Sequence, residues 1–495
     1  MAPNTPAMVK TQLANPSAAR KFFYRRRVVV MGLGLHGGAL HVTRWLMAHG
    51  AQVRVTDVQP APALEPTLQK LPRSSRLTLV LGRHRVRDFR WAQVVVQNPA
   101  VPRESPYLAV ARRAGARLEN EATLFFQLVG RQRIIGVTGT RGKSTTAALA
   151  AAIVRQRFRR TMLGGNIATA PMFAIVERVC RSRDPVVLEL SSSQVENLGQ
   201  QRRSPHVAVV TNVLPDHLNR YRSMAAYAAA KRQLVAHQEA GDFAVLNADN
   251  PASWRFRLGA PSTVIACSRR AASFAPRVFF ARDWIWWHGE SRAERLLPVS
   301  AVRLFGAHNL DNILAAVAVG KIYRVPPGLM RSAVSGFSGL PFRQQLIGSW
   351  RGVRYLNDTT ATTPEATVAA LTTVLERWPE IRGRIILIAG GSDKRLPKAS
   401  FARLGKLIAA ACKAVVAFAG AGSKRLVAEI PAARGARLSI VSERTTMAQA
   451  VAAAQALSSR GDLVLLSPAC ASFGLFQHEF DRGEQFTQCV KQPVV

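Results

Sequence analysis

The segment IIGVTGTRGKSTTAALAAAI, residues 134–153, decides the fold of this chain. An apolar run of strand type over Arg133–Val137 enters a glycine-rich turn at Gly139–Gly142, and an alanine-rich helix follows. Glycines allow backbone N–H groups to approach phosphates closely, and the positive end of a new helix attracts them. The order of strand, glycine loop, Lys143-Ser144 and helix therefore predicts a nucleotide-phosphate site in an α/β domain.

Lys143 and Ser144 supply the chemistry that a bound nucleoside triphosphate requires. The lysine would reach the β- and γ-phosphates, and the serine hydroxyl would be a ligand of Mg²⁺. The spacing departs from the generic P-loop, because Val137 occupies the place of the first glycine and Gly136 lies one residue earlier. The alternative is a strand-to-helix turn without a ligand, but the coincidence of all these features favours a phosphate site.

Short apolar runs between turn signals continue along the chain, as expected for α/β layers around parallel sheets. A length of 495 residues predicts about three domains. We place them at residues 25–130, 131–340 and 341–495, after a flexible basic tail at residues 1–24. The strands that we predict are Val28–Met31, Arg133–Val137, Val186–Leu190, Val207–Val213, Phe243–Leu246, Ile385–Ala389, Ala414–Ala417 and Leu463–Leu466.

Composition narrows the class of protein. Hydrophobic residues make up 48 % of the chain, which excludes a largely disordered protein, and no long apolar run predicts a transmembrane helix. Arg25–Arg27 and the apolar stretch Val28–Leu40 imitate a signal peptide, but the glycines in that stretch favour a strand that enters a turn. The five cysteines are widely spaced and form no CxxC pair, so we expect no disulfides and a cytoplasmic location.

The net charge of +39 is open to several explanations: a nucleic-acid partner, an anionic membrane surface or an acidic substrate. Arginines are scattered through every segment, and no zinc finger or aromatic RNA-binding motif accompanies them. We therefore expect a basic solvated surface and no specific nucleic-acid partner. A nucleic-acid-binding ATPase stays as an alternative.

A second glycine motif, Gly32, Gly34 and Gly37, follows the first predicted strand, and Asp57 lies twenty residues beyond its last glycine. This spacing is typical of dinucleotide-binding turns, and the same geometry suits the diphosphate of a nucleotide sugar. The motif alone leaves three interpretations open: an NAD-dependent oxidoreductase, a nucleotide-sugar site, or a tight turn without a ligand.

Polar groups also follow two later strands. Glu189 ends an apolar run, and a carboxylate at the carboxyl end of a strand can bind the cation of a nucleotide. His217 follows the segment Thr211–Asp216 after the next apolar run. From its position alone, this histidine is equally compatible with a packed loop residue.

Taken in order, these motifs resemble the Mur ligase family over roughly residues 28–490. The segment Leu466–Phe473 and the triplet Asp481-Arg482-Gly483 resemble the glutamate-adding members of that family. Several motifs recur in one order, which makes the resemblance more specific than any single motif. The others are Gly139–Thr145, Gly164–Ile167, Glu189–Ser192, Thr211–Leu218, Gly306–Asn312 and Leu340–Arg343.

The resemblance implies a Rossmann-like N-terminal domain for UDP, a central P-loop-type ATPase domain and a Rossmann-like C-terminal domain for the amino acid. It implies an ATP-dependent ligase that joins glutamate to UDP-N-acetylmuramoyl-L-alanine through an acyl phosphate, in peptidoglycan precursor synthesis. Two Mg²⁺ ions would neutralise the charge that develops in such a reaction. We expect a monomer that acts on small-molecule substrates.

The resemblance also implies roles for particular residues. The metal ligands would be Ser144, Glu189, His217 and a carbamylated Lys231, and Lys143 would be catalytic with the last three. ATP would contact Gly139, Thr140, Arg141, Gly142, Lys143, Ser144, Thr145, Asn309, Asn312, Arg343 and Asp358. The UDP substrate would lie along Leu35, His36, Asp57, Asn98, Asn166 and Ser191, and glutamate would contact Thr362, Lys394 and Ser472. Without the family, Lys231 reads as an ordinary surface lysine of a helix.

The chain departs from the family pattern in the amino-acid pocket. Thr360 stands where the pattern has a lysine, and Glu479-Phe480 stands where Phe-Glu is usual. Loss of one cation removes a charge-assisted hydrogen bond worth about 1.5–3 kcal/mol. We expect D-glutamate to be the substrate, with L-glutamate as the alternative.

Overall fold

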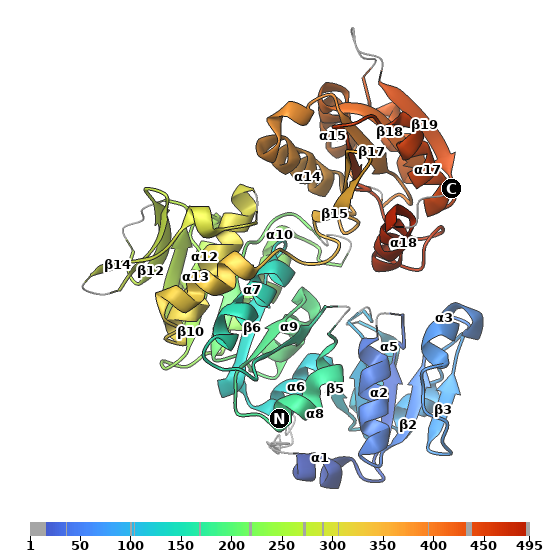
Figure 1. Cartoon of the computed structure of the whole chain (residues 1–495). Coiled ribbons are helices and arrows are strands. Elements are labelled where there is room, and N and C mark those ends of the chain that lie inside the picture. Colours follow the sequence, from blue (N-terminus) through green and yellow to red (C-terminus); the bar gives the residue numbers. More distant parts are fainter. Residues whose placement is uncertain are drawn as a thin grey trace. The chain divides into compact units, whose positions relative to one another are not determined.

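The computed structural model describes most of the chain and divides it into two compact units (Figure 1). The first unit contains residues up to 303 together with 307–337, and the second contains residues 304–306 and 338–495. The residues described are 16–35, 37–99, 101–102, 104–167, 170–216, 220–270, 274–289, 292–304, 306–394, 396–431 and 438–491.

The first sheet of unit 1 has five parallel strands in the order β3-β2-β1-β4-β5. Alternate residues of β1 pack on opposite faces: Val29 and Met31 meet Phe89 on one face, and Val28 and Val30 join the larger core on the other. Helices on both faces of a parallel sheet define a Rossmann-like domain. The elements are β1 (Arg27–Met31), α2 (Gly38–Ala48), β2 (Gln52–Thr56), α3 (Ala61–Leu68), β3 (Leu77–Val80), α4 (Val86–Trp91), β4 (Val94–Gln97), α5 (Pro106–Arg113) and β5 (Arg117–Glu119).

The expectation of a flexible tail over residues 1–24 is wrong for its last part. Residues Pro16–Phe23 form helix α1, in which Ala19 and Phe23 are fully buried. The ring of Phe23 meets Trp45 of α2 edge to face, with 5.4 Å between centroids. Burial of these apolar groups stabilises a short helix that the polar composition of the segment conceals. Residues 1–15 lie outside the described part of the chain.

The second sheet of unit 1 has nine strands in the order β14-β13-β12-β11-β10-β9-β6-β8-β7. Its strands are parallel from β7 to β12, and β13 and β14 extend it in antiparallel fashion. The strands are β6 (Ile134–Thr138), β7 (Met162–Gly165), β8 (Val186–Glu189), β9 (Val207–Val210), β10 (Phe243–Asn247), β11 (Thr263–Ser268), β12 (Arg277–Ala281), β13 (Trp284–His288) and β14 (Ala293–Pro298). The helices are α6 (Glu121–Val129), α7 (Lys143–Arg155), α8 (Met172–Cys180), α9 (Ser192–Gln200), α10 (Met224–Ala236), α11 (Pro251–Trp254), α12 (Ala307–Ile322) and α13 (Pro327–Gly336).

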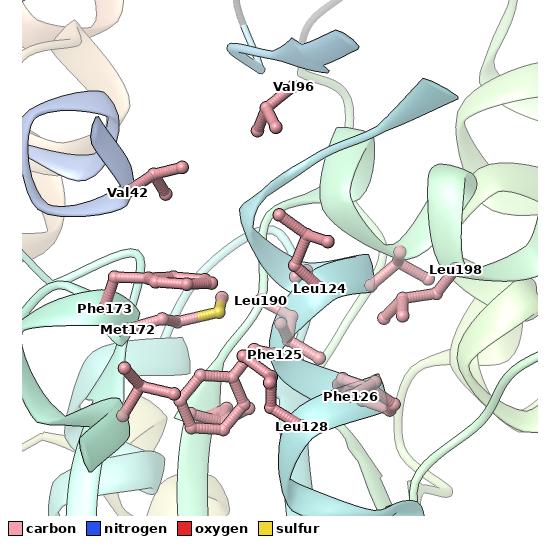
Figure 2. Packing of buried hydrophobic residues seen from close by; sticks show 14 of the residues in the cluster. Val42, Val96, Leu124, Phe125, Phe126, Leu128, Met172, Phe173, Leu190 and Leu198 are labelled. Carbon is pink, nitrogen blue, oxygen red and sulfur yellow. The ribbon is translucent and has the colours of Figure 1, made fainter. Parts of the chain in front are cut away.

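Helix α6 joins the two sheets of unit 1 and is buried along its whole length. Figure 2 shows Leu124, Phe125 and Leu128 of this helix among apolar side chains, with Met172 and Phe173 of α8 nearby. Burial of large side chains contributes about 1.5–3 kcal/mol each. Because residues of both sheets and of α6 belong to one buried cluster, the core of the first sheet continues into that of the second.

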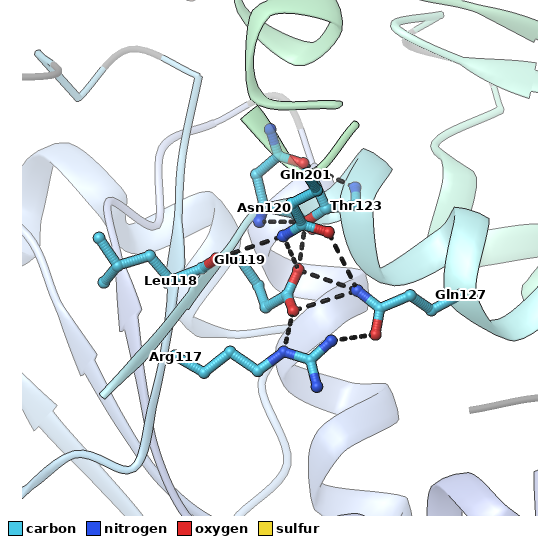
Figure 3. Close-up of polar contacts among 7 residues, drawn as sticks. All are labelled: Arg117, Leu118, Glu119, Asn120, Thr123, Gln127 and Gln201. Atoms are coloured by element: carbon cyan, nitrogen blue, oxygen red, sulfur yellow. Dashed lines mark hydrogen bonds and ion pairs between the residues drawn. The ribbon is translucent and has the colours of Figure 1, made fainter. Parts of the chain in front are cut away.

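A buried carboxylate holds the start of α6 in position (Figure 3). Glu119, at the end of β5, is 1 % exposed and accepts hydrogen bonds from Arg117 and from the Thr123 hydroxyl. Gln127 of α6 and Gln201, which follows α9, donate to the same carboxylate at 3.1 Å and 2.9 Å. A buried charge requires such partners. This network fixes β5, α6 and α9 relative to one another.

Unit 2 contains a six-stranded sheet in the order β15-β16-β20-β17-β18-β19, in which only β15 is antiparallel. Residues of alternate parity face opposite sides: Leu387 packs with α14–α16, and Ile388 packs with α17 and α18. The strands are β15 (Gln345–Trp350), β16 (Val353–Asn357), β17 (Ile385–Ala389), β18 (Cys412–Phe418), β19 (Ser439–Arg444) and β20 (Leu463–Leu466). The helices are α14 (Pro364–Arg377), α15 (Lys398–Ala411), α16 (Ala421–Ala428), α17 (Met447–Leu457) and α18 (Glu479–Lys491).

The fold confirms the predicted class, three α/β domains built around mostly parallel sheets. Each strand named from the sequence is present, with ends that differ by a few residues. The five cysteines are free thiols, as expected. Among the described helices, none has the length and apolar character needed to cross a membrane.

Candidate functional site

The phosphate loop lies between β6 and α7, where the sequence predicts it. Gly139 and Gly142 have φ values of 151° and 79°. A Cβ atom on Gly139 would lie 1.9 Å from the Thr211 hydroxyl, and one on Gly142 would lie 2.1 Å from the Asn312 side-chain oxygen. Both glycines are therefore required by close packing as well as by backbone conformation.

The segment after β9 anchors this loop. Thr140 N–H donates to the Asn212 carbonyl at 2.9 Å, and the Thr211 hydroxyl donates to the Arg141 carbonyl at 2.6 Å. Arg141 N–H donates to the Asn212 side chain at 2.9 Å. Because β9 is the neighbour of β6 in the sheet, the two segments meet at the same carboxyl edge. The polar pair after β9 holds the loop in shape.

The side chain of Lys231, in α10, contacts the phosphate loop. Its side chain is 1 % exposed, and Nζ donates to the Gly139 carbonyl at 2.8 Å. Burial, followed by the charge of Lys143, lowers the pKa of Lys231 to about 7, although Asp216 and Glu189 act in the opposite direction. At pH 7 an amine with this pKa is neutral in about half of the molecules, whereas a surface lysine stays protonated.

Glu189 carries the strongest indication of a cation. It ends β8, the other neighbour of β6, and is 3 % exposed. Its Oε2 atom has no hydrogen-bond partner among the described residues. A buried carboxylate oxygen without a partner is costly unless a ligand completes it. The free oxygen of Glu189 is of the kind that a hard divalent cation prefers, at the carboxyl edge where the sequence predicts one.

The histidine of the predicted metal set, His217, lies outside the described residues. Within the described ranges no cluster of three or more His, Cys, Asp or Glu side chains could hold a metal.

Asn309 and Asn312 lie on the first turns of α12, and Asn312 packs on the loop. Asn312 accepts from the Thr146 hydroxyl at 3.2 Å and donates to Asn309 at 3.0 Å. Lys143 donates to the Thr140 carbonyl at 3.0 Å. The structure therefore brings the predicted ATP-binding residues of unit 1 together around one loop.

The second glycine motif forms a turn after β1 that depends on Asp57. Gly32 and Gly34 have positive φ values of 86° and 59°. One carboxylate oxygen of Asp57 accepts from the N–H groups of Leu33 and Gly34 at 2.7 Å and 3.1 Å, and the other accepts from Gln59 N–H at 2.9 Å. The immediate role of Asp57 is thus to shape the turn.

The other predicted contacts of the UDP substrate are found near this turn or beside Glu189. Asn98 donates to the Gly32 carbonyl at 3.2 Å, and Leu35 is half-buried. Asn166 N–H donates to the Glu189 carbonyl at 2.9 Å, and Ser191 is the N-cap of α9. His36 lies outside the described residues.

Unit 2 brings the three predicted glutamate contacts to one edge. Thr362, Lys394 and Ser472 follow β16, β17 and β20, which are adjacent in the sheet. Lys394 Nζ donates to the Thr362 hydroxyl at 2.9 Å. Ser392 and Ala471 exchange backbone hydrogen bonds at 3.0 Å and 3.3 Å, which draws the β17 and β20 segments together.

Asp358, predicted to contact ATP, is 7 % exposed. Burial raises its pKa to about 7, against hydrogen bonds from Ser467 and from Gln344 N–H and the charge of Arg343. The nearby Thr360, which replaces the lysine of the family pattern, donates its hydroxyl proton to the Phe342 carbonyl at 3.1 Å. This hydroxyl is therefore already engaged within the loop.

Sequence reasoning missed two residues of these sites. The ring of Tyr227 faces the amine of Lys231, with 4.6 Å between Nζ and the ring centroid. The Tyr227 hydroxyl is 3.3 Å from that of Thr140. Arg482 is fully buried and bonded to Thr359 and Cys470. Both residues stand in motifs that the sequence shows. Their importance is indicated by their burial, which only the fold reveals.

A glycine loop at a helix N-terminus, a buried lysine bonded to that loop, and a buried carboxylate oxygen with no hydrogen-bond partner among the described residues define a nucleotide-dependent phosphoryl-transfer protein. Family models make the assignment narrower. The Mur ligase MurD-like N-terminal domain matches residues 26–119, the Mur ligase middle domain matches 137–320, and the Mur ligase glutamate ligase domain matches 342–470. The chain belongs to the Mur ligase family and is an ATP-dependent ligase.

Similar proteins extend over nearly the whole chain. The UDP-N-acetylmuramoylalanine--D-glutamate ligase of Roseiflexus sp. (strain RS-1) is 41 % identical over 478 residues, which cover 94 % of this chain and 98 % of that protein. The protein of the same name from Symbiobacterium thermophilum is 36 % identical, with coverage of 94 % and 98 %.

Solved structures share the fold. The UDP-N-acetylmuramate-alanine ligase of Thermotoga maritima has a TM-score of 0.61 at 17 % identity, covering 94 % of this chain and 99 % of its own. A pseudomurein peptide ligase type C from Methanothermus fervidus has a TM-score of 0.55 at 16 % identity, with coverage of 94 % and 100 %.

Proposed function

We propose that the chain joins D-glutamate to UDP-N-acetylmuramoyl-L-alanine at the cost of ATP, in peptidoglycan precursor synthesis. The buried pair of Lys231 and Glu189 beside the phosphate loop is the observation that carries this proposal, since an oxidoreductase would have no use for it. The names of the full-length relatives support glutamate and its D-configuration.

The reaction would proceed in two steps. The alanine carboxylate of the UDP substrate attacks the γ-phosphate of ATP, which forms an acyl phosphate and releases ADP. The amine of glutamate then attacks the acyl carbon, an amide bond forms, and phosphate leaves. Lys143 and the N–H groups of the loop would stabilise the charge on the transferred phosphoryl group. Bound Mg²⁺ would supply further neutralisation of that charge.

The residues would divide the work by position. Lys143, Ser144 and the loop residues Gly139–Thr145, with Asn309, Asn312, Arg343 and Asp358, would bind ATP. Glu189, Ser144, His217 and Lys231 would hold the cations. Leu35, His36, Asp57, Asn98, Asn166 and Ser191 would contact the UDP substrate, and Thr362, Lys394 and Ser472 would contact glutamate.

Lys231 would act as a carbamate. A neutral amine is the form that reacts with carbon dioxide, and burial lowers the pKa of Lys231 to about 7. The amine would add to carbon dioxide with loss of one proton, and the carbamate would keep one N–H for the bond to the Gly139 carbonyl and supply carboxylate-type oxygens for a cation. This change would convert a repulsive neighbour of the cation into a ligand.

Several coarser features complete the proposal. The free cysteines support a reducing compartment, and we propose a cytoplasmic monomer that has no specific nucleic-acid partner. We keep the boundaries 25–130, 131–340 and 341–495 as the proposed domain limits.

The decisive experiment measures phosphate release from ATP with the UDP substrate and either D- or L-glutamate. We expect turnover that requires all three substrates and is at least about tenfold faster with D-glutamate, a difference of roughly 1.4 kcal/mol. Faster turnover with L-glutamate would establish the alternative substrate, because Thr360 has replaced a cation in the pocket. Turnover stimulated by DNA alone, or a requirement for NAD, would point to the other classes of protein.

A further inference from the structure

Arg482 is among the largest side chains that are fully buried in the described structure. It lies in the first turn of α18, and its guanidinium group makes three hydrogen bonds. Nε donates to the Thr359 hydroxyl at 3.0 Å, Nη2 donates to the Thr359 carbonyl at 2.8 Å, and Nη1 donates to the Cys470 carbonyl at 3.3 Å.

In the described part of the chain this cation forms no ion pair with a carboxylate, although the charge of Glu479 acts on it from a greater distance. Among the described residues, no Asp or Glu side chain lies within ion-pair distance of Arg482, although other arginines of unit 2, such as Arg384 and Arg425, have one. Removal of a charge from water costs free energy that uncharged oxygens only partly offset. A residue that serves only the core would be better replaced by an apolar side chain, so a geometric role is indicated.

The bonds of Arg482 reach the two segments that carry two of the proposed glutamate contacts. Thr359 follows β16 and lies three residues before Thr362. Cys470 follows β20 and lies two residues before Ser472. Strands β16 and β20 are adjacent, so one guanidinium group bonds to the segments that follow both strands.

Packing around Arg482 keeps α18 close to these segments. A Cβ atom on Gly483 would lie 2.5 Å from Thr359 Cγ2. The Thr359 hydroxyl donates to the Glu479 carbonyl at 2.8 Å, and the Asn357 amide donates to the Gly483 carbonyl at 2.8 Å. The helix therefore cannot shift without moving Thr359.

We propose that Arg482 is a positioning residue that sets the separation of Thr362 and Ser472 and so determines the affinity for the amino-acid substrate. This inference rests on the proposed function. A planar guanidinium group can bridge three acceptors in fixed directions, whereas the ammonium group of a lysine is a compact point charge. Charge alone is therefore insufficient at this position.

The test compares Arg482→Lys with the wild-type enzyme under steady-state conditions. We expect the KM for glutamate to rise at least about tenfold, while the KM values for ATP and the UDP substrate stay within about threefold and kcat at saturating glutamate is largely retained. Thr487→Val is the matched control, because it removes a different bond between α18 and β16, that of the Thr487 hydroxyl with Asn357. It should lower the melting temperature without changing the KM for glutamate.

Thr359→Val provides the second, independent variant. It removes the hydroxyl that accepts from Nε, so it should also raise the KM for glutamate, and its effect should not add to that of Arg482→Lys. If Arg482→Lys fails to fold, Thr359→Val alone decides the question.

The outcomes separate this inference from the proposed function. Wild-type enzyme that does not ligate glutamate would refute the function. Wild-type enzyme that does so, with an unchanged glutamate KM in either variant or with equal rises for all three substrates, would refute the positioning role.

Discussion

Lys231 illustrates what a single residue reveals only in the folded state. In the sequence it stands in an alanine-rich helix and reads as a surface lysine. In the structure it is 1 % exposed and touches the phosphate loop. The family pattern pointed to the position, but burial and the lowered pKa were inaccessible to sequence reasoning because both arise from segments distant along the chain.

Replacement of Lys231 by alanine should abolish most of the ligase activity while the protein stays folded. We expect a loss of about 10²-fold or more, because the proposed carbamate ligand of the cation beside the reacting phosphates is removed. A short-chain carboxylate such as acetate should restore part of the activity by filling the space. Lys413, which pairs with Asp462 at 2.7 Å in unit 2, is the control, and Lys413→Ala should be active. A fully active Lys231→Ala enzyme would contradict the carbamate proposal.

Asp358 predicts a measurable pH dependence of stability. Its pKa is raised from 3.8 to about 7, so the folded state holds a proton that the unfolded state has lost between these values. Stability contributed at this site therefore falls as pH rises through that window and is constant above it. The melting temperature of Asp358→Asn, relative to wild type, should rise between pH 4 and pH 7. A difference that is independent of pH would show that this carboxyl titrates normally.

At the scale of elements, the phosphate loop was the most predictable part of the molecule. Its strand, its glycines and its helix are contiguous, so local rules suffice. The position of Asp57 was predictable from its spacing to the glycine motif. Its role in shaping the turn was not, because that role depends on hydrogen bonds that only the fold shows. The α1 helix was missed because two buried residues, Ala19 and Phe23, carry its stability in a segment of polar composition.

The loop geometry makes a prediction about Gly142. An added methyl group would meet Asn312 at 2.1 Å with φ at 79°, so Gly142→Ala should displace Asn312 and raise the KM for ATP at least about tenfold. Gly115 is a matched control, since its φ is 78° and nothing lies near its added methyl group. Gly115→Ala should cost about 1 kcal/mol of stability through backbone strain and leave the KM for ATP unchanged. Equal effects of the two variants would refute close packing as the reason for Gly142.

At the scale of the whole molecule, the charge of +39 has consequences for stability. Like charges repel in the compact state, and salt screens them with a Debye length of about 10 Å at 0.1 M. The melting temperature should therefore rise between about 0.05 M and 0.3 M salt. Sodium chloride and potassium acetate should act alike, because screening depends on ionic strength. A fall in melting temperature would mean that attractive ion pairs outweigh the repulsion.

Helix α1 bears on how the protein can be handled at the bench. Phe23 of this helix packs against Trp45 of the first domain, although the first strand of that domain begins only at Arg27. The strand pattern alone would place the domain boundary at that strand. A protein truncated there would lack α1 and would expose the apolar surface that this helix covers. The truncated protein should aggregate during purification, whereas a protease site inserted ahead of Pro16 would leave the packing of α1 intact.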